Sequence, residues 1–320
     1  MVLVLVEHAG GVATDPSLQS LTLARSLAGR EPVQALLIGG EAPAVAATLG
    51  SHGVTVAHIA NHAGLETFAP DAWASTLDEL AVRLPAGAVV APGTERGNEV
   101  MARLAARTGL PLAVNCIAVT AGPPVTLTRL RWGGSLFEEA RLVSPRPLLT
   151  VAPHTVAVEA ASTSNEVEVK PFTPALDGAD LVVRVAEHIG ASGGGISLTE
   201  AKVVVSGGRG VGSKEGFAII EELAGLLGAA VGCSRAVTSA GWRPHTDQVG
   251  QTGTKIAPDI YIACGISGAT QHMAGCKGAK KILAINADGE APIMLSADYA
   301  VIGDLKEIVP AISAEIRKRQ

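Results

Sequence analysis

The chain has 320 residues, a length typical of two domains, and 48% of them are apolar, so disorder is excluded as the main state. It carries 25 Lys and Arg residues against 30 Asp and Glu residues, and only 3% of its residues are aromatic. Such a chain offers neither a basic surface for a phosphate backbone nor a stacking platform for bases, so nucleic-acid binding is not expected. No apolar run approaches the ~18 residues of a membrane helix, so a transmembrane segment is not predicted.

The first half alternates short branched-aliphatic runs with helical stretches, the pattern of βα units that form a mainly parallel sheet. Apolar residues at helical spacing predict helices over 17–28 and 71–84. The first apolar run is too short for the core of a signal peptide and is predicted as a strand, so a cytoplasmic location is expected. The predicted strands of this half are Val2–Val6, Val33–Ile38, Val54–Ile59 and Ala88–Ala91.

After Pro111, polar and apolar residues alternate around a Gly-Gly pair, a pattern typical of antiparallel hairpins. The strands predicted in these hairpins are Val125–Arg131, Glu138–Val143 and Glu166–Lys170. The stretch GASGGGIS that begins at position 190 cannot form a helix and is predicted to be a flexible link. We therefore expect an N-terminal α/β domain over residues 1–190, a linker over 191–200 and a second domain over 201–320.

A second βα series follows this link, and the loops after its strands are where a ligand is expected, because ligands of α/β sheets lie beyond the carboxyl ends of the strands. A helix is predicted over 214–227, with Ser213 as its N-cap and Gly228 as its C′ residue, and another begins at about Leu305. The predicted strands are Lys202–Val205, Ala229–Gly232, Ile260–Ala263, Lys281–Ile285 and Tyr299–Ile302.

The first of these loops, SGGRGVGSK over 206–214, holds Arg209 among glycines whose bare amides favour an anion. It is not a Rossmann GxGxxG loop, which would need glycine at Ser213, and not a P-loop, which would have its Lys before its Ser. A phosphate-bearing ligand of another kind remains open, beside the simpler interpretation of a tight turn with a solvated arginine. The second loop holds Ser234 and Arg235, and the third is VGQTG over 249–253; both could equally be polar surface turns.

The fourth loop leads from strand 260–263 into a helix. Ser267 is predicted as the N-cap, which would leave the following amides free to bind an anion. Gln271 and His272 fall in the first turn, where the helix end disfavours a second proton on the imidazole while a ring N–H can still donate. The sequence Gly-Ile-Ser-Gly-Ala is one glycine short of a nucleophile elbow, and no Asp and His follow in hydrolase order, so a serine hydrolase is not expected.

Asn286 and Asp304 end the two remaining strands and complete a set of polar loops at one predicted sheet edge. Cys116, Cys233, Cys264 and Cys276 form no Cys-x-x-Cys pair, so reduced thiols are expected and a metal site is not. The inventory therefore favours binding of a large, phosphate-bearing cofactor over hydrolysis.

These ordered motifs resemble those of the α subunit of electron transfer flavoproteins. The family elements SGGRG, SR and VGQTG match residues 206–210, 234–235 and 249–253. The first half resembles the family only in LVEH at 5–8 and KPF at 170–172, and Cys233 and Thr270 depart from the residues usual at their positions. The longest match, from Ile260 to Asn286, includes Tyr261, Gly265, Ser267, Gly268, Gln271, His272, Gly275, Ile282, Ala284 and Asn286.

The resemblance implies two α/β domains, the second of them Rossmann-like and FAD-binding, in a heterodimer. The β subunit would contact the N-terminal domain, cover part of the flavin, and carry AMP or a second FAD. The protein would be an electron carrier in electron transport, not an enzyme. It would take electrons from dehydrogenases, such as the acyl-CoA dehydrogenases of fatty acid β-oxidation, and pass them to a membrane quinone oxidoreductase or another acceptor through an anionic semiquinone.

The resemblance also implies roles for individual residues. Arg209 and Arg235 would approach the isoalloxazine ring, with Thr252 near its N5 and His272 near its O2. Asp304 and Leu305 would meet the adenosine end. The full set implied to bind FAD is Arg209, Ser234, Arg235, Gly250, Gln251, Thr252, Ser267, Gly268, Ala269, Thr270, Gln271, His272, Asn286, Asp304 and Leu305.

An NAD-dependent enzyme on a domain similar to that of deoxyhypusine synthase remains the alternative. It would need a catalytic lysine near the cavity, and Lys214 and Lys255 are the candidates.

Overall fold

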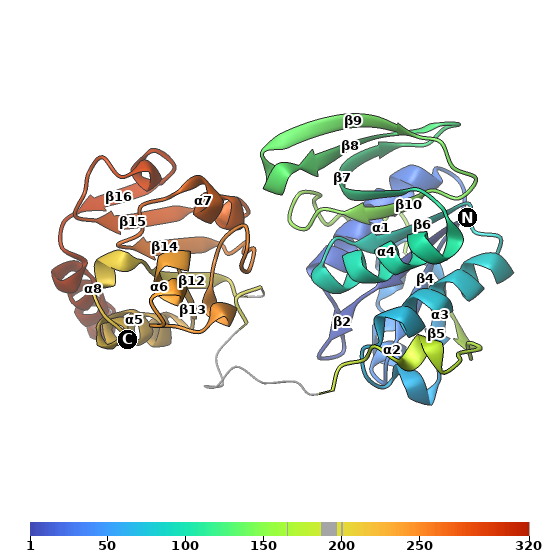
Figure 1. The fold of residues 1–320 in the computed structure, drawn as a ribbon, viewed down its shortest axis with the longest axis horizontal. Coiled ribbons are helices and arrows are strands. Elements are labelled where there is room, and N and C mark those ends of the chain that lie inside the picture. The colour runs from blue at the N-terminus through green and yellow to red at the C-terminus, as the bar shows by residue number, and fades with distance from the viewer. Residues whose placement is uncertain (165, 187–196, 200, 320) are drawn as a thin grey trace. The chain divides into compact units, whose positions relative to one another are not determined.

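The computed structural model describes residues 1–164, 166–186, 197–199 and 201–319. The chain divides into two compact units, residues 1–188 and 189–320, each built of α-helices around a β-sheet (Figure 1). The expectation of two α/β domains is confirmed. Residues 191–196 and 200 of the expected linker lie outside the described residues, so the domain boundaries stay a prediction.

The first unit is built on a nine-stranded sheet in the order β11-β5-β4-β1-β6-β10-β7-β8-β9. Neighbours from β11 to β7 are parallel, and β8 and β9 extend this sheet in the antiparallel sense. The strands are β1 (Val2–Val6), β4 (Val33–Ile38), β5 (Val54–Ala60), β6 (Ala88–Pro92), β7 (Leu112–Thr120), β8 (Val125–Arg131), β9 (Leu136–Leu142), β10 (Leu148–Val151) and β11 (Glu168–Phe172). A separate small hairpin pairs β2 (His8–Ala9) with β3 (Val12–Ala13).

Apolar side chains cover both faces of this sheet. On one face, Leu21 of α1 (Asp15–Ala28) and Val45 of α2 (Ala42–Ala46) join the core, and on the other Leu77 of α3 (Pro70–Arg83) and Met101 of α4 (Glu95–Thr108) do so. Thr94 caps the start of helix α4, since its Oγ1 accepts a hydrogen bond from the Gly97 N–H at 2.9 Å.

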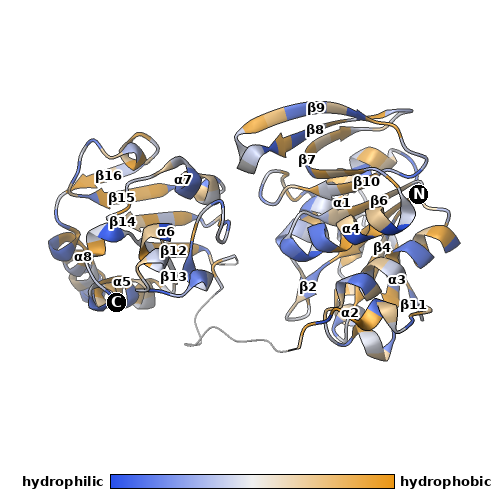
Figure 2. Ribbon diagram, in the orientation of Figure 1, coloured by the Kyte–Doolittle hydropathy of each residue, from blue (hydrophilic) through white to orange (hydrophobic). Residues whose placement is uncertain are grey.

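The hairpin prediction is confirmed in part. Strands β8 and β9 pair antiparallel, and Figure 2 shows polar and apolar segments alternating along β9. The assignment of Glu166–Lys170 to a hairpin is wrong, because β11 pairs parallel with β5 at the sheet edge. A two-residue alternation shows that one face is exposed, but it does not show which strand lies alongside.

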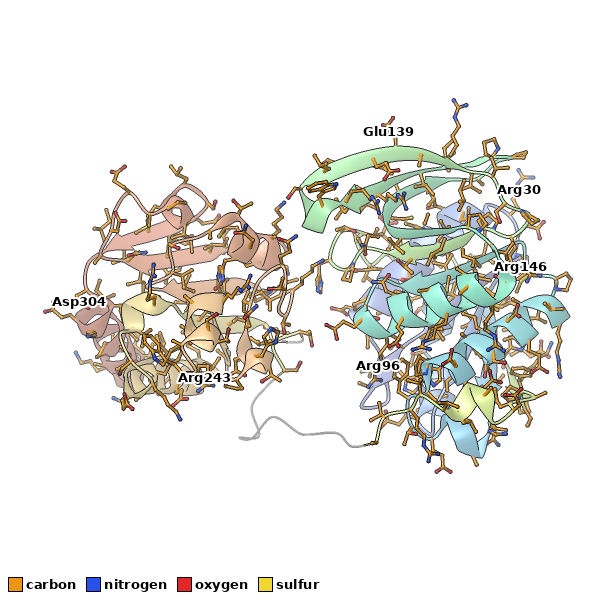
Figure 3. The ribbon with its side chains drawn as sticks, in the orientation of Figure 1. Arg30, Arg96, Glu139, Arg146, Arg243 and Asp304 are labelled. Carbon is orange, nitrogen blue, oxygen red and sulfur yellow. The ribbon has the colours of Figure 1, made fainter. Side chains whose placement is uncertain are left out.

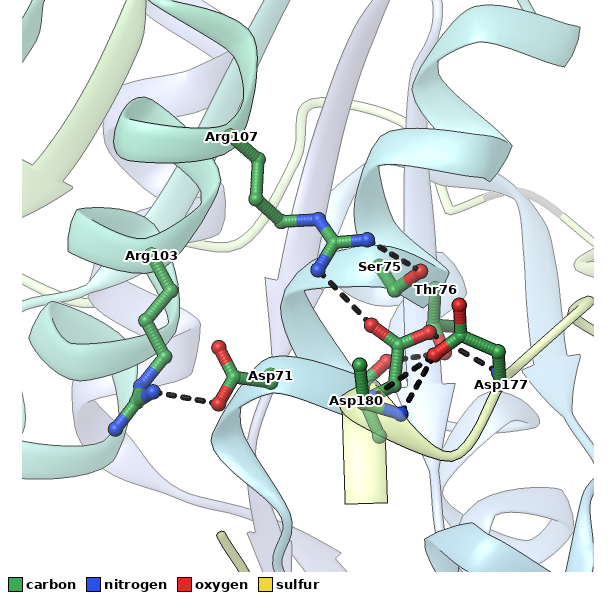
Figure 4. A network of polar contacts seen from close by, with 9 residues as sticks. Asp71, Ser75, Thr76, Arg103, Arg107, Asp177 and Asp180 are labelled. Carbon is green, nitrogen blue, oxygen red and sulfur yellow. Dashed lines mark hydrogen bonds and ion pairs between the residues drawn. The ribbon is translucent and has the colours of Figure 1, made fainter. Parts of the chain in front are cut away.

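The segment that follows β11 folds back over α3 and α4. The Arg107 guanidinium donates to the buried Asp180 carboxylate at 2.9 Å, and Asp177 accepts from the Asp180 N–H at 3.1 Å (Figure 4). A second ion pair joins Arg103 to Asp71 at 2.6 Å beside it. The Arg107–Asp180 pair holds this segment against α4, and the Arg103–Asp71 pair joins α4 to α3.

The second unit has a five-stranded sheet, parallel throughout, in the order β13-β12-β14-β15-β16. Numbered within the unit, this is the flavodoxin-type order 2-1-3-4-5, so the Rossmann-like detail of the prediction is not confirmed. The strands are β12 (Val203–Gly207), β13 (Ala230–Cys233), β14 (Ile260–Cys264), β15 (Ile282–Asn286) and β16 (Tyr299–Ile302).

Helices lie on both faces of this sheet as well. Leu223 of α5 (Ala218–Leu227) and Val309 of α8 (Leu305–Arg319) belong to one core, and Cys276 of α7 (Thr270–Cys276) belongs to the other. The short helix α6 (Arg235–Ser239) follows β13. As predicted, Gly228 ends α5 in the left-handed conformation, with φ of 59°.

No helix in the described part of the chain is long and apolar enough to cross a membrane.

Candidate functional site

A cavity of about 490 Å³ lies at the carboxyl edge of the five-stranded sheet. From β12 the chain goes to β13 on one side, and it then returns to β14 on the other side of β12. The loops that follow β12 and β14 therefore leave adjacent strands in opposite directions, and the cavity lies between them. The residues that line it are Arg209, Gly210, Ser234, Arg235, Ala236, Gln248, Val249, Gly250, Gln251, Thr252, Gly265, Ile266, Ser267, Gly268, Ala269, Gln271, His272, Asn286, Asp288 and Ala291.

Glycines allow the loops after β12 and β14 to meet backbone to backbone. The Gly208 N–H donates to the Cys264 carbonyl at 2.8 Å, and the Gly210 N–H donates to the Gly265 carbonyl at 3.1 Å. A Cβ on Gly208 would lie 2.1 Å from the Gly265 oxygen, so no larger residue fits there. This contact places Gly210 and Gly265 side by side in the cavity lining.

Helix α7 and the loop 249–253 pack against each other and form one wall of the cavity. The Gln251 N–H donates to the Gln271 carbonyl at 2.7 Å, and the Ile256 N–H donates to the Gly275 carbonyl at 2.8 Å. A Cβ on Gly275 would lie 2.3 Å from the Gly250 nitrogen. The loop is therefore packed closely against the helix.

The buried Gln248, which lies outside the motifs named above, connects this wall to α6 through hydrogen bonds. Its Oε1 accepts from Thr238 Oγ1 at 2.7 Å, and its Nε2 donates to Thr252 Oγ1 at 3.1 Å. Its position directly before VGQTG was visible, but nothing in the sequence shows that its amide bridges two loops.

Two arginines without ion pairs bring positive charge to the cavity. Arg209 and Arg235 both line it and are exposed, and within the described residues neither side chain makes an ion pair or a hydrogen bond. Arg243, which is labelled in Figure 3, pairs by contrast with Glu221 and Asp247. Unpaired guanidinium groups at a cavity favour an anionic or carbonyl-rich ligand.

His272 is only 7% exposed. Its Nε2 lies 2.7 Å from the Tyr261 hydroxyl, and its Nδ1 makes no hydrogen bond. Burial lowers the pKa of His272 to about 4, which the backbone of Val249 offsets only in part. The imidazole is therefore neutral near pH 7, as expected, but burial is the cause.

Three of the residues implied to bind FAD do not line the cavity. Leu305 is 4% exposed and packs in the core against Gly265. Asp304 accepts the Lys306 N–H at 2.8 Å, which makes it the N-cap of α8 (Figure 3). Thr270 is the exposed first residue of α7. The cavity does bring together Arg209, Ser234, Arg235, Gly250, Gln251, Thr252, Ser267, Gly268, Ala269, Gln271, His272 and Asn286.

The prediction that Ser267 caps α7 is wrong. The N-cap position falls on Ala269, and no side chain caps the helix there. The reason is a turn at Gly268, whose φ is 81° and whose missing Cβ leaves room for the Ile293 backbone. The helix consequently begins after this turn.

The described residues give no support at this site for a catalytic lysine, a metal ion or a reactive thiol. Lys214 and Lys255, which an NAD-dependent enzyme would need, are exposed and do not line the cavity. In the part of the chain that the structure describes, no cluster of His, Cys, Asp or Glu could hold a metal ion. The four cysteines are buried free thiols, and burial raises the pKa of each to about 12.

Both units match domains of known proteins. Residues 2–177 match the model of the electron transfer flavoprotein domain, and residues 197–277 match that of the electron transfer flavoprotein FAD-binding domain. The chain is 35% identical over 319 residues to the electron transfer flavoprotein subunit alpha of Bacillus subtilis, covering 99% of this chain and 97% of the relative. It is 40% identical over 324 residues to the subunit of the same name from Mycobacterium tuberculosis, covering 100% and 99%.

Proposed function

The chain belongs to the family of electron transfer flavoprotein α subunits, and from this premise we propose that its second unit binds one FAD in the cavity described above. The protein then serves as an electron carrier without a substrate of its own. The observation that carries the proposal is the presence of two unpaired guanidinium groups, Arg209 and Arg235, at one cavity.

The residues present fit this cofactor. The glycine contacts around Gly208 and Gly275 let the loops that form the cavity pack closely on one another, and the lining supplies hydroxyl, amide and guanidinium donors. The volume of about 490 Å³ lies in the ordinary range of cofactor pockets. Such donors suit a ligand with a pyrophosphate and ring carbonyls.

FAD, when bound, supplies the redox chemistry by accepting and releasing electrons. Arg235 and Arg209 favour the negative charge that an added electron brings, because a guanidinium in a partly desolvated site attracts an anion strongly. The Gln248 amide donates a hydrogen bond to the Thr252 hydroxyl and so fixes the position of this hydroxyl in the cavity lining. His272 remains neutral, so it acts as a dipole and not as a cation.

The proposal extends to partners. The β subunit contacts the first unit, covers part of the flavin and carries AMP or a second FAD. Trp132 and Phe137 support this, because they are 80% and 71% exposed on the β8–β9 hairpin, where such large apolar side chains indicate a contact surface. Donors are flavin dehydrogenases, such as those of fatty acid β-oxidation. The acceptor is a membrane quinone oxidoreductase or an equivalent, and the location is cytoplasmic.

The test is purification of the chain co-expressed with its β partner, followed by absorbance spectroscopy and by quantification of FAD and AMP. A yellow heterodimer with one FAD in the second unit, which is reduced in one-electron steps, is expected. A colourless complex that binds NAD would contradict the proposal and favour the dehydrogenase-like alternative.

A further inference from the structure

A buried tyrosine lies directly behind the cavity. Tyr261, on β14, is fully buried, and its hydroxyl is 2.7 Å from Nε2 of His272, which does line the cavity. The two rings are tilted by 33° with their centroids 6.0 Å apart. Their contact is therefore a hydrogen bond between ring edges and not a stack.

The surroundings fix which atom donates in this hydrogen bond. Burial raises the pKa of Tyr261 well above its ordinary value, so the hydroxyl keeps its hydrogen. Ser206 lies near this hydroxyl, but its Oγ makes no hydrogen bond. Among the described residues, Nε2 of His272 is then the one acceptor for the tyrosine hydrogen at bonding geometry.

The opposite arrangement is less favourable. If Nε2 carried the hydrogen and donated to the tyrosine oxygen, the tyrosine hydrogen would be buried without a partner, whereas Nδ1 makes no hydrogen bond in either arrangement. Leaving a buried donor unsatisfied destabilises the fold. With the hydrogen on Nδ1, the lone pair of Nε2 is used, and the Val249 backbone beside the ring favours a hydrogen there.

We propose that Tyr261 is a positioning residue that holds His272 in the neutral tautomer with its hydrogen on Nδ1. Tyr261 does not reach the cavity and acts through His272 alone. The N–H that His272 can offer a ligand is consequently the Nδ1–H, which makes no hydrogen bond within the described chain.

The consequence for electron transfer rests on the proposed function. A ring whose hydrogen stays on one nitrogen presents a fixed dipole to a bound flavin, and a dipole that is already oriented stabilises new charge without reorganisation. A ring that exchanged tautomers would present an averaged dipole and would have to reorient at each electron transfer.

The test is ¹⁵N NMR of the histidine-labelled, FAD-loaded heterodimer. The signals of His272 are assigned by their loss in His272→Gln. We expect a protonated Nδ1 and an unprotonated, hydrogen-bonded Nε2 in the unmodified protein. In Tyr261→Phe, the ring should shift toward the Nε2–H tautomer that free histidine prefers. The first reduction potential should also differ from that of the unmodified protein.

Ser313→Ala is the matched control, because it removes another buried hydroxyl of the second unit that makes no hydrogen bond. It should leave the His272 shifts unchanged. A protonated Nε2 in the unmodified protein would overturn the proposal even if Tyr261→Phe does not fold, and unchanged shifts in a folded Tyr261→Phe would also overturn it. FAD content is measured on the same samples, so absence of FAD contradicts the proposed function separately from the tautomer result.

Discussion

Arg209 and Arg235 differ from the other described arginines of the second unit in having no partner. Arg243, Arg317 and Arg319 all pair with a glutamate. The charged groups in the lining are the two unpaired guanidinium groups and the carboxylate of Asp288, so the lining carries a net positive charge.

Arg235→Ala should lower the first reduction potential of the bound flavin. Loss of a charge worth about 1–2 kcal/mol corresponds to roughly 40–90 mV for one electron. Redox titration of the heterodimer measures this, with the exposed Lys255→Ala as control, since Lys255 does not line the cavity. Equal potentials in Arg235→Ala and the unmodified protein would contradict the role of Arg235.

His272 should make the stability of the second unit depend on pH. Its folded pKa of about 4 lies below the ordinary 6.5, so between these values the unfolded chain binds a proton that the folded chain does not. Stability should therefore fall as the pH drops from 6.5 toward 4, by about 3 kcal/mol at most from this group.

Urea unfolding across this pH range is the measurement. His272→Gln should flatten the dependence, and His245→Gln, at an exposed position in the same unit, should retain it. If the slopes of His272→Gln and the unmodified protein coincide, the buried imidazole is not the cause.

At the scale of elements, contacts between glycines decide the shape of the site. Helix α7 can approach the loop 249–253 only because Gly275 has no side chain. The turn at Gly268 likewise sets where α7 begins, and this overrode the capping preference of Ser267.

Gly275→Ala should therefore separate α7 from its loop. Its Cβ would lie 2.3 Å from the Gly250 nitrogen, and overpacking of this kind costs about 1–3 kcal/mol, with loss of FAD. Gly225→Ala is the matched control, because a Cβ there meets nothing within 4 Å inside α5 and should stabilise the helix by about 0.5–1 kcal/mol. Denaturation and FAD content of both variants check this, and full FAD retention by Gly275→Ala would be inconsistent with a rigid wall.

For the whole molecule, the central prediction is the interface with the β subunit. Replacing Trp132 and Phe137 together by Ser should weaken the heterodimer more than tenfold, because truncating large aromatic side chains in an interface commonly costs above 1.4 kcal/mol. Titration of the purified subunits measures the affinity. Val182→Ser, at a position 77% exposed elsewhere in the first unit, is the control and should bind normally. An unchanged affinity of the double variant would place the interface elsewhere.

The sequence by itself determined most elements and the location of the site. Strands such as Val2–Val6 and Val33–Ile38 occur where their branched-aliphatic runs predict them, because burial in a sheet demands such residues. The loops that carry Arg209, Ser234 and His272 converge because parallel strands end at one edge. Local patterns suffice wherever a feature depends on residues close together in the chain.

Only the tertiary structure decided the features that depend on distant residues. These are the parallel pairing of β11 with β5, the Gln248 amide that bridges two loops, and the hydrogen bond between Tyr261 and His272. The same is true of Leu305, which the resemblance assigned to a ligand and the fold places in the core. The physical reason is that neighbours brought together by folding, and not the residue type, fix which strand pairs, which donor is satisfied and which side chain reaches a cavity.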